Sequence, residues 1–253
     1  MSIRVLYCGD TEMETITVTK GFDYYQFSYA LDDSGHLRAA FDADPEISYR
    51  HLPVDHVHPD FPMDAAGLAE YDVVILSDVG FNNLSLIPGF RPPHRVPMGP
   101  NRVTAIHDYV HGGGGLMMVG GWMSFSGIYG KAGFGGTPIE ELLPVVCQRG
   151  VDDRIEVVEG FDFRPSISHS ITDGLPWDES FTLLGYNRVI PRQDATVIAA
   201  RGPDPIVAVR TVGSGRSAIF ASDVAPHWGG TFVGWAGYSE FWTRMVKWLA
   251  GAL

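Results

Sequence analysis

Residues 112–125 read Gly112-Gly113-Gly114-Gly115-Leu116-Met117-Met118-Val119-Gly120-Gly121-Trp122-Met123-Ser124-Phe125. The four leading glycines are typical of a helix end, because glycine adopts the left-handed backbone found there. The apolar run that follows predicts a buried strand, and Gly120-Gly121 predicts a sharp turn after it. Open α/β sheets bind their ligands at the carboxyl ends of such strands. The segment therefore predicts an α/β fold with a candidate site at the glycine turn.

Three other short apolar runs predict buried strands of the same sheet, at residues 3–8, 47–52 and 73–76. Residues 21–41 mix aromatic and polar side chains, and we expect them to contain helix with a break near residues 32–35. Strands that alternate with helices indicate a parallel sheet with right-handed crossovers. We expect strands 3–8, 73–76 and 116–119 to be central in a mainly parallel sheet with helices on both faces.

Capping residues predict where three helices begin. Asn101 is a good N-cap for a helix that runs to His111. Thr137-Pro138-Ile139-Glu140 has a capping-box pattern with proline at the first helical position, which predicts a short helix. Ser239 is expected to cap a final helix with one apolar face.

Beyond Val151 the pattern changes to short strands separated by turn signals. The strand candidates are residues 155–158, 181–189, 196–200, 206–210 and 217–221. We expect an antiparallel extension of the same sheet or a small β subdomain. The chain is thus predicted to be one domain of residues 1–253, with a core of about 1–150 and 215–253 and a β-rich extension of about 151–214.

The net charge of −12 and the pI of about 5.0 argue against a nucleic-acid partner, because phosphate binding needs clustered Lys and Arg. No apolar run approaches the ~20 residues that span a bilayer, and the first residues lack a signal-peptide pattern. We therefore expect a cytoplasmic protein with no membrane partner. Cys8 and Cys147 fit a reducing compartment and are interpreted as buried small apolar side chains.

Segments spread along nearly the whole chain resemble one bacterial family. They are Gly9-Asp10, Gly21-Phe22-Asp23, residues 71–78, Pro100-Asn101-Arg102, and residues 113–127, 137–145, 152–156, 185–187, 222–228 and 235–249. With these segments the chain resembles the glutamine amidotransferase-like proteins of the class I glutamine amidotransferase-like superfamily, a group of mostly unassigned function. The resemblance implies a flavodoxin-like core. Trehalose-utilisation-type proteins are more distant relatives, which suggests sugar chemistry only by analogy.

The resemblance also implies where an amidotransferase would carry its nucleophile. The superfamily has a Gly-x-Cys-x-Gly elbow after a central strand and a His-x-Glu dyad near the C-terminus. Here the elbow reads Gly120-Gly121-Trp122-Met123-Ser124, and the nearest counterpart of the dyad is His227-Trp228-Gly229. Cys8 and Cys147 lie elsewhere in the sequence. A glutaminase without its nucleophile loses nearly all its rate, so we predict no glutamine hydrolysis.

The turn itself suggests two further roles. Backbone N–H groups at Gly120-Gly121 can form an anion-binding nest, and Trp122 is expected to lie over it. Ser124 or Ser126 could replace the missing thiol, but a serine nucleophile needs a base within hydrogen-bond reach. The alternative is that these hydroxyls satisfy backbone groups of the turn, which is the more frequent role of a turn serine.

Three aspartates follow predicted strands and are expected at the same edge of the sheet. Asp10, Asp78 and Asp223 could act as acid and base, hold sugar hydroxyls or bind a metal, or each could simply cap a loop. Residues 222–230 add His227 and Trp228 in the same loop as Asp223. An aromatic face beside polar groups suits a sugar or another flat-faced ligand, although Trp228 could equally pack the loop onto the core.

One cleft is therefore predicted at the carboxyl edge of the sheet. The ligand-binding candidates are Asp10, Asp78, Gly120, Gly121, Trp122, Ser124, Asp223, His227 and Trp228. The catalytic candidates are His227, Asp223 and Asp78, with one of the two aspartates orienting the imidazole. This prediction requires His227 to reach back from the late β region to the glycine turn.

No cofactor and no metal are predicted. The first strand is not followed by a Gly-x-Gly-x-x-Gly fingerprint, and no P-loop is found. His51, His56 and His58 resemble a metal cluster by number alone, but Pro53 and Pro59 indicate an irregular loop and no closed four-ligand spacing is visible.

Three functions stay open at this point. The first is a domain that binds a small polar molecule without glutaminase activity. The second is a hydrolase of a different class, acting on a sugar or an amide, and a convergent pocket with raised carboxylate pKa values would favour it. The third is a structural or regulatory subunit, which a wide apolar patch would favour, and self-association of the chain is left open.

Overall fold

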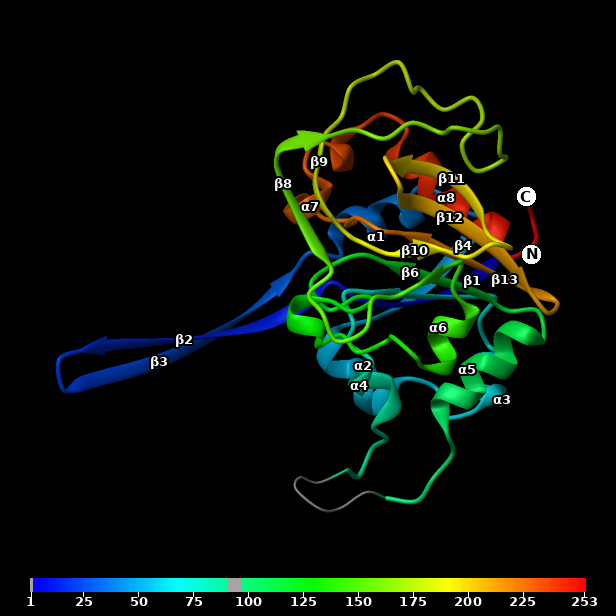
Figure 1. The fold of residues 1–253 in the computed structure, drawn as a ribbon. Coiled ribbons are helices and arrows are strands. Elements are labelled where there is room, and N and C mark those ends of the chain that lie inside the picture. The colour runs from blue at the N-terminus through cyan, green and yellow to red at the C-terminus, as the bar shows by residue number, and fades with distance from the viewer. Residues whose placement is uncertain (1, 91–96) are drawn as a thin grey trace.

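Seven strands form the central sheet of the computed structural model, which describes residues 2–90 and 97–253 (Figure 1). Their order across the sheet is β11-β12-β13-β6-β5-β1-β4. The strands span β1 Ile3–Gly9, β4 Ile47–Leu52, β5 Val73–Ser77, β6 Gly115–Val119, β11 Thr196–Arg201, β12 Asp204–Val212 and β13 Gly215–Phe220. β4, β1, β5, β6 and β13 are parallel, and β12 and β11 are antiparallel.

The central strands are those that the sequence predicts. Strands β6, β5 and β1 are neighbours, and every residue of β5 and β6 is buried. Strands buried on both faces read as continuous apolar runs, which is why these segments were recognisable. The prediction of a mainly parallel α/β sheet with a flavodoxin-like arrangement is confirmed.

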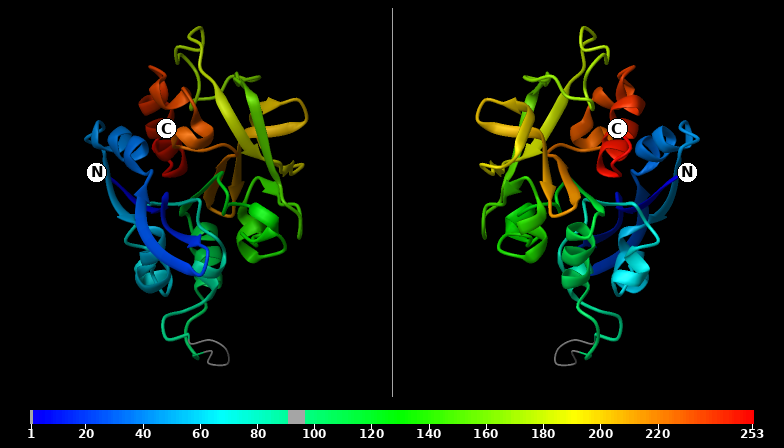
Figure 2. Two further views of the ribbon diagram at one scale, coloured as in Figure 1. Left: turned by 90° about the vertical axis from the view of Figure 1, so that its left-hand side faces the viewer. Right: turned by 90° about the vertical axis from the view of Figure 1, so that its right-hand side faces the viewer.

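Helices cover both faces of the sheet. Helices α1 (Gly35–Asp42) and α8 (Tyr238–Leu249) pack against each other on one face. The other face carries α2 (Val54–Asp60), α3 (Ala65–Leu68), α4 (Asn82–Ser85), α5 (Arg102–His111) and α6 (Pro138–Leu142) (Figure 1, Figure 2). Every helix among the described residues is too short or too polar to cross a membrane.

Two of the three predicted helix starts are confirmed. The Asn101 side chain accepts hydrogen bonds from the backbone N–H groups of Val103 and Thr104 at the start of α5. Thr137 accepts from Glu140 at the start of α6. The Ser239 prediction is wrong, because α8 begins at Tyr238 with Gly237 in the capping position and no side-chain cap.

The strands of the expected β-rich extension are divided among three sheets. Strands β11 and β12 extend the main sheet, whereas β8 (Arg154–Phe161) and β9 (Leu183–Asn187) pair separately with each other. Strands β7 (Val145–Val146) and β10 (Ile190–Pro191) form a further short pair. After β13 the chain forms α7 (Pro226–Gly229) and the 3₁₀ turn η2 (Phe232–Gly234), and another 3₁₀ turn, η1 (Ile128–Gly130), follows the glycine turn.

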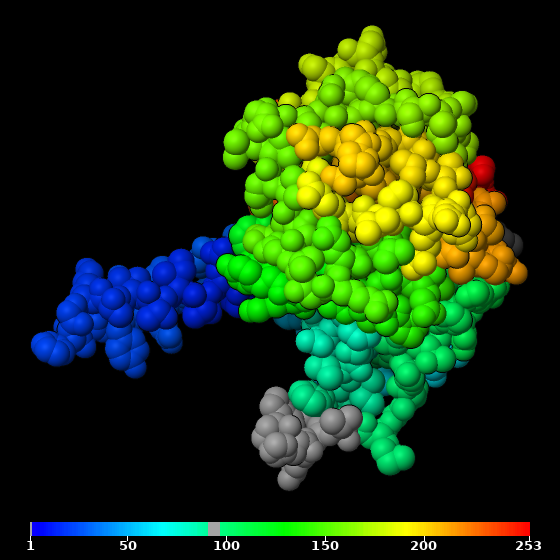
Figure 3. Space-filling model, in the orientation of Figure 1, coloured from blue at the N-terminus to red at the C-terminus, as the bar shows by residue number. Residues whose placement is uncertain are grey.

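A long hairpin replaces most of the helix expected in residues 21–41. Strands β2 (Thr11–Lys20) and β3 (Asp23–Asp32) pair along their whole length, and helix begins only at Gly35. The expected helix is thus present only after the break near residues 32–35. The residues before the break form a strand, because β-branched and aromatic residues alternate along the hairpin with the period of two that favours a ribbon. The hairpin, hereafter the arm, projects from the body as the blue extension of the molecule (Figure 3).

Candidate functional site

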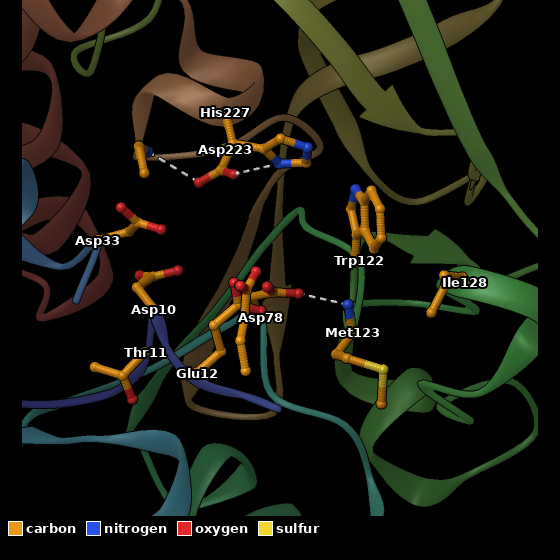
Figure 4. A pocket seen from close by; sticks show the side chains of 12 residues that line it. Asp10, Thr11, Glu12, Asp33, Asp78, Trp122, Met123, Ile128, Asp223 and His227 are labelled. Atoms are coloured by element: carbon orange, nitrogen blue, oxygen red, sulfur yellow. Dashed lines mark hydrogen bonds and ion pairs between the residues drawn. The ribbon is translucent and has the colours of Figure 1, made fainter. Parts of the chain in front are cut away.

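A pocket of about 360 Å³ opens at the carboxyl ends of β1, β5 and β6 (Figure 4). Cavities that bind small molecules begin at about this size. The side chains that line it come from the strand ends, the base of the arm, the glycine turn and the loop after β13. They are Asp10, Thr11, Glu12, Glu14, Asp33, Asp78, Trp122, Met123, Ile128, Asp223, Ala225 and His227.

The backbone at two strand ends turns the aspartates toward this space. Asp10 has φ 53° and Asp78 has φ 51°, so both adopt the left-handed conformation. Aspartate visits this region more readily than most residues, yet it still stores strain that tends to occur at functional sites. Gly121, with φ 152°, allows the close approach, because a Cβ there would lie 2.6 Å from Oδ1 of Asp78.

Asp10 is, together with Asp223, one of the two buried aspartates in the pocket lining. Ser77 donates a hydrogen bond of 2.9 Å to its Oδ1, and the Tyr7 hydroxyl donates to its Oδ2. Burial raises the pKa of Asp10 well above its ordinary value, and the nearby charge of Asp223 raises it further. The protonated form of Asp10 is therefore stabilised relative to that of a free carboxyl group.

Asp78 is fixed by the glycine turn across from it. Its Oδ1 accepts from the backbone N–H of Met123, and its own N–H donates to Oγ of Ser124 at 3.1 Å. Burial raises the pKa of Asp78 to about 7, and the charge of Asp223 acts in the same direction. Near neutral pH this carboxyl group is thus present in both protonation states.

Asp223 and His227 form a pair on the opposite wall. Nδ1 of His227 lies 3.5 Å from Oδ2 of Asp223, whose Oδ1 accepts from the N–H of Ala225 at 2.9 Å. The bond to Asp223 raises the pKa of His227 above its ordinary value. Of the two candidate aspartates, Asp223 is the one that lies within ion-pair distance of the imidazole. The ring centroid of His227 lies 5.5 Å from that of Trp122, so the imidazole does reach the glycine turn.

Trp122 directly follows the glycine pair of the turn after β6. Its side chain is 40% exposed and forms part of the pocket wall. The guanidinium of Arg154 lies 4.4 Å from the centre of its ring and is held by Asp152. A cation over an indole face is attractive, so Arg154 and His227 together fix the orientation of the indole.

A buried polar network that the sequence did not reveal supports the turn from below. Asn187, at the end of β9, accepts from the N–H of Gly121 at 2.9 Å and donates to its carbonyl at 3.1 Å. It also donates to Asp153, whose oxygens accept from the N–H groups of Ser126 and Gly127. The network forms because Asn187, Asp153 and the glycine turn, which are distant in the sequence, come together in the fold. No local sequence motif predicts it.

The base of the arm supplies four pocket residues that sequence reasoning missed: Thr11, Glu12, Glu14 and Asp33. The N–H of Asp33 donates to the carbonyl of Asp10 at 2.8 Å and so closes the base of the arm. Burial raises the pKa of Asp33 as well. The alternating pattern of residues 11–32 is the signal that could have revealed these residues, because it indicates a hairpin next to Asp10.

Not all predicted site residues reach the pocket surface. Gly120, Gly121 and Ser124 are buried and shape the turn from behind. Trp228 is fully buried, and its indole N–H donates to Glu156 at 3.0 Å, so its ring packs beneath His227. The hydroxyl of Ser124 receives the N–H of Asp78, which agrees with the turn-capping interpretation.

Both thiols lie away from the pocket lining. Cys8 is 0% exposed within β1, and Cys147 is 2% exposed after β7. Burial raises the pKa of each thiol, which keeps it protonated and poorly nucleophilic.

The three histidines of residues 51–58 are not gathered around one point. Residues 54–60 form helix α2 rather than the expected irregular loop. His51 bonds to the carbonyl of Gly9, and His56 pairs with Asp60. Across residues 2–90 and 97–253, no three His, Cys, Asp or Glu side chains are arranged to hold a metal ion.

A parallel sheet with a glycine turn after its central strand and a polar pocket beside that turn define an α/β protein of amidotransferase-like architecture. The chain belongs to the family described as "Putative glutamine amidotransferase", whose model matches residues 4–251. A search of curated proteins finds no match.

Two solved structures resemble the chain over nearly its full length. Cytoplasmic protein STM3548 from Salmonella typhimurium is 31% identical, with a TM-score of 0.90 over 97% of this chain and 98% of that one. Cytoplasmic protein STM1381 from Salmonella typhimurium LT2 is 33% identical, with a TM-score of 0.90 over 98% and 99%. A ThuA-like protein from Parabacteroides merdae, at 11% identity and a TM-score of 0.51 over 99% and 90%, shares the fold alone.

Proposed function

We propose that the chain binds a small, donor-rich ligand without a net negative charge at the carboxyl edge of the sheet, and that it does not hydrolyse glutamine. The observation that carries this proposal is the composition of the pocket. Six of the lining side chains are acidic, and none of the described lining residues is Lys or Arg. Such a lining repels anions and pairs with hydroxyl or ammonium groups.

Two features support the absence of glutaminase activity. An indole stands where the family's elbow would present a thiolate, and both thiols of the chain are buried elsewhere. The α-carboxylate of glutamine would also meet a pocket rich in negative charge. The acidic net charge and the two cytoplasmic Salmonella relatives support a cytoplasmic location without a nucleic-acid or membrane partner.

A thermal-shift and calorimetric panel tests the ligand class. The panel has three groups of compounds: neutral polyols and sugars, organic amines, and anions such as glutamate and phosphate. We expect compounds of one of the first two groups to raise the Tm of the protein and the anions to leave it unchanged. Asp223→Asn should weaken binding at least tenfold, whereas exposed Asp42→Asn should not. Tight binding of an anion that Asp223→Asn leaves intact would overturn the proposal.

Ammonia release tests the negative part. Purified protein with glutamine should release no ammonia above the buffer rate. Release that disappears in Cys8→Ser or Cys147→Ser, with folding retained, would refute the prediction and restore a cysteine mechanism.

A second candidate function adds acid–base catalysis at the same pocket. The raised pKa of Asp78, about 7, opposite the Asp223–His227 pair is the observation that favours it. Protonated Asp78 would act as the acid, and His227 oriented by Asp223 would act as the base in hydrolysis of a sugar or amide bond. Aryl glycosides and aryl amides are the probes, and turnover lost in both Asp78→Asn and His227→Gln supports this candidate. If the wild type shows no turnover, or if both variants retain full turnover, acid–base catalysis by these residues is excluded and only the proposed binding function remains.

A further inference from the structure

The arm has one apolar face that nothing in the described chain covers. In the β2–β3 register Ile16 is opposite Phe27, and Val18 is opposite Tyr25. Successive residues of a strand alternate between faces, so these four share one face with Tyr29. The rings of Tyr25, Phe27 and Tyr29 stack at centroid distances of 6.4 Å. Phe27 is 47% exposed and Tyr25 is 50% exposed.

The middle of the opposite face is polar and satisfied within the arm. Thr15 and Ser28 share a hydrogen bond of 2.7 Å, and Gln26 donates to Thr17 at 2.9 Å. Over the middle of the ribbon the two faces thus differ in chemistry, one polar and the other apolar. Nearer its ends, Glu14, Lys20 and Asp23 lie on the apolar face, and Met13 and Tyr24 lie on the polar face. A scattered apolar residue needs no explanation, but a continuous aromatic row on a projecting ribbon indicates an interaction site.

A free two-stranded ribbon of this length is only marginally stable in water. The arm stands away from the body, which its strands contact mainly at α2 near the base (Figure 1, Figure 3). Burying the aromatic face against a partner would supply the apolar contact that the ribbon lacks.

We infer that the arm is a self-association device, and that its aromatic face, formed by Ile16, Val18, Tyr25, Phe27 and Tyr29, packs against the same face of a second copy. An apolar face complements itself across a twofold axis, and such an isologous contact closes at two copies. The contact also lies at a distance from the body, which lowers the repulsion between two chains of net charge −12.

The size of the face agrees with a weak dimer. Its five side chains occupy about five residue positions along the arm, or about 17 Å, and two strands with their side chains are about 10 Å wide. Two such faces in contact bury on the order of several hundred Å² in total, which is the size of a weak, transient interface. The acidic body argues against an anionic membrane as the occupant.

Sedimentation velocity over about 1–200 μM tests the inference. The wild-type chain should pass from monomer to dimer in this range. Phe27→Lys places a charge in the centre of the apolar face and should weaken association at least tenfold. Its neighbour Gln26→Lys adds the same charge on the polar face and should leave association unchanged. Because both positions lie outside the core, circular dichroism should show native folding for both variants.

Amide hydrogen exchange locates the contact without any variant. Protection of residues 14–29 should rise with protein concentration, while that of the central sheet should not change. A wild-type chain that stays monomeric at 200 μM would overturn the inference, as would a dimer that Phe27→Lys and Gln26→Lys affect equally. A monomer with a protected arm only in the presence of another protein would assign the face to a different partner.

Discussion

Asp78 brings backbone strain, burial and charge together in one residue. Its left-handed φ is tolerated because the neighbouring turn at Gly121 leaves room for the carboxyl group. Burial and the charge of Asp223 raise its pKa to about 7. The residue is therefore held at a cost to stability, and this cost depends on pH.

Asp78→Asn should remove that pH dependence. A carboxyl group whose folded pKa is raised adds stability below its unfolded pKa of about 4, and this stability is lost as pH rises through about 7. The upper bound of the effect is about 4 kcal/mol, from 1.36 kcal/mol per pKa unit. Between pH 5 and pH 8, Tm should fall more steeply for the wild type than for Asp78→Asn. Parallel curves would show that Asp78 titrates normally.

Gly120→Ala should destabilise the fold strongly. A Cβ at this position would lie 2.2 Å from the carbonyl oxygen of Ala221, and backbone cannot move aside as a flexible side chain can. We expect a loss of roughly 2–4 kcal/mol, read as a drop in Tm of about 4–16 °C. Gly234→Ala is the matched control, because a Cβ there meets nothing within 4 Å. Equal drops in both variants would contradict the packing account.

At the level of elements, the glycine turn after β6 depends on the end of β9. Asn187→Ala leaves the N–H and carbonyl of buried Gly121 without their partner and weakens the support of Asp153. Unsatisfied buried polar groups cost roughly 1–3 kcal/mol each, so for these two groups we expect a loss of about 2–6 kcal/mol. Amide exchange at Gly121 and Trp122 should accelerate, whereas exposed Asn82→Ala should change neither quantity. Unchanged exchange at the turn would show that β9 does not hold it.

The parallel strands and two helix caps were predictable because their signals are local. Residues 73–76 and 116–119 are continuous apolar runs, and the side chains of Asn101 and Thr137 cap helices through bonds to residues within three positions. The arm was missed because its strands bury no core face, so its alternation resembles an ordinary mixed segment. The sequence therefore predicts those elements of the fold in which burial requires apolar side chains.

Of the candidate site, the sequence predicted only the residues that follow the parallel strands. Asp10 and Asp78 follow from strand order, since parallel strands end at one edge. The Asn187–Asp153 network and the acidic residues of the arm depend on pairings between distant segments, which one sequence does not display. For Trp228 the sequence left two roles open, contact with a ligand or packing of the loop onto the core, and the buried ring agrees with the second. The roles of the site residues stay predictions.

For the whole molecule, shortening the arm should separate assembly from folding. Replacing residues 15–28 with Asn-Gly joins Glu14 to Tyr29, which are opposite each other in the register, through a tight turn. Thr11, Glu12, Glu14 and Asp33 remain beside the pocket. We expect a monomer with cooperative unfolding and unchanged ligand binding. Loss of cooperative unfolding would mean that the arm is part of the fold rather than an attachment.

The hydrogen bond between Asp33 and Asp10 lies where the arm meets the pocket. A ligand that fills the pocket and a partner that holds the arm therefore act on the same short segment of backbone. Thermodynamic linkage makes any such coupling reciprocal: if dimerisation changes the affinity for the ligand by some factor, the ligand changes the dimerisation constant by the same factor. The ratio of monomer to dimer would then report ligand concentration in the cell.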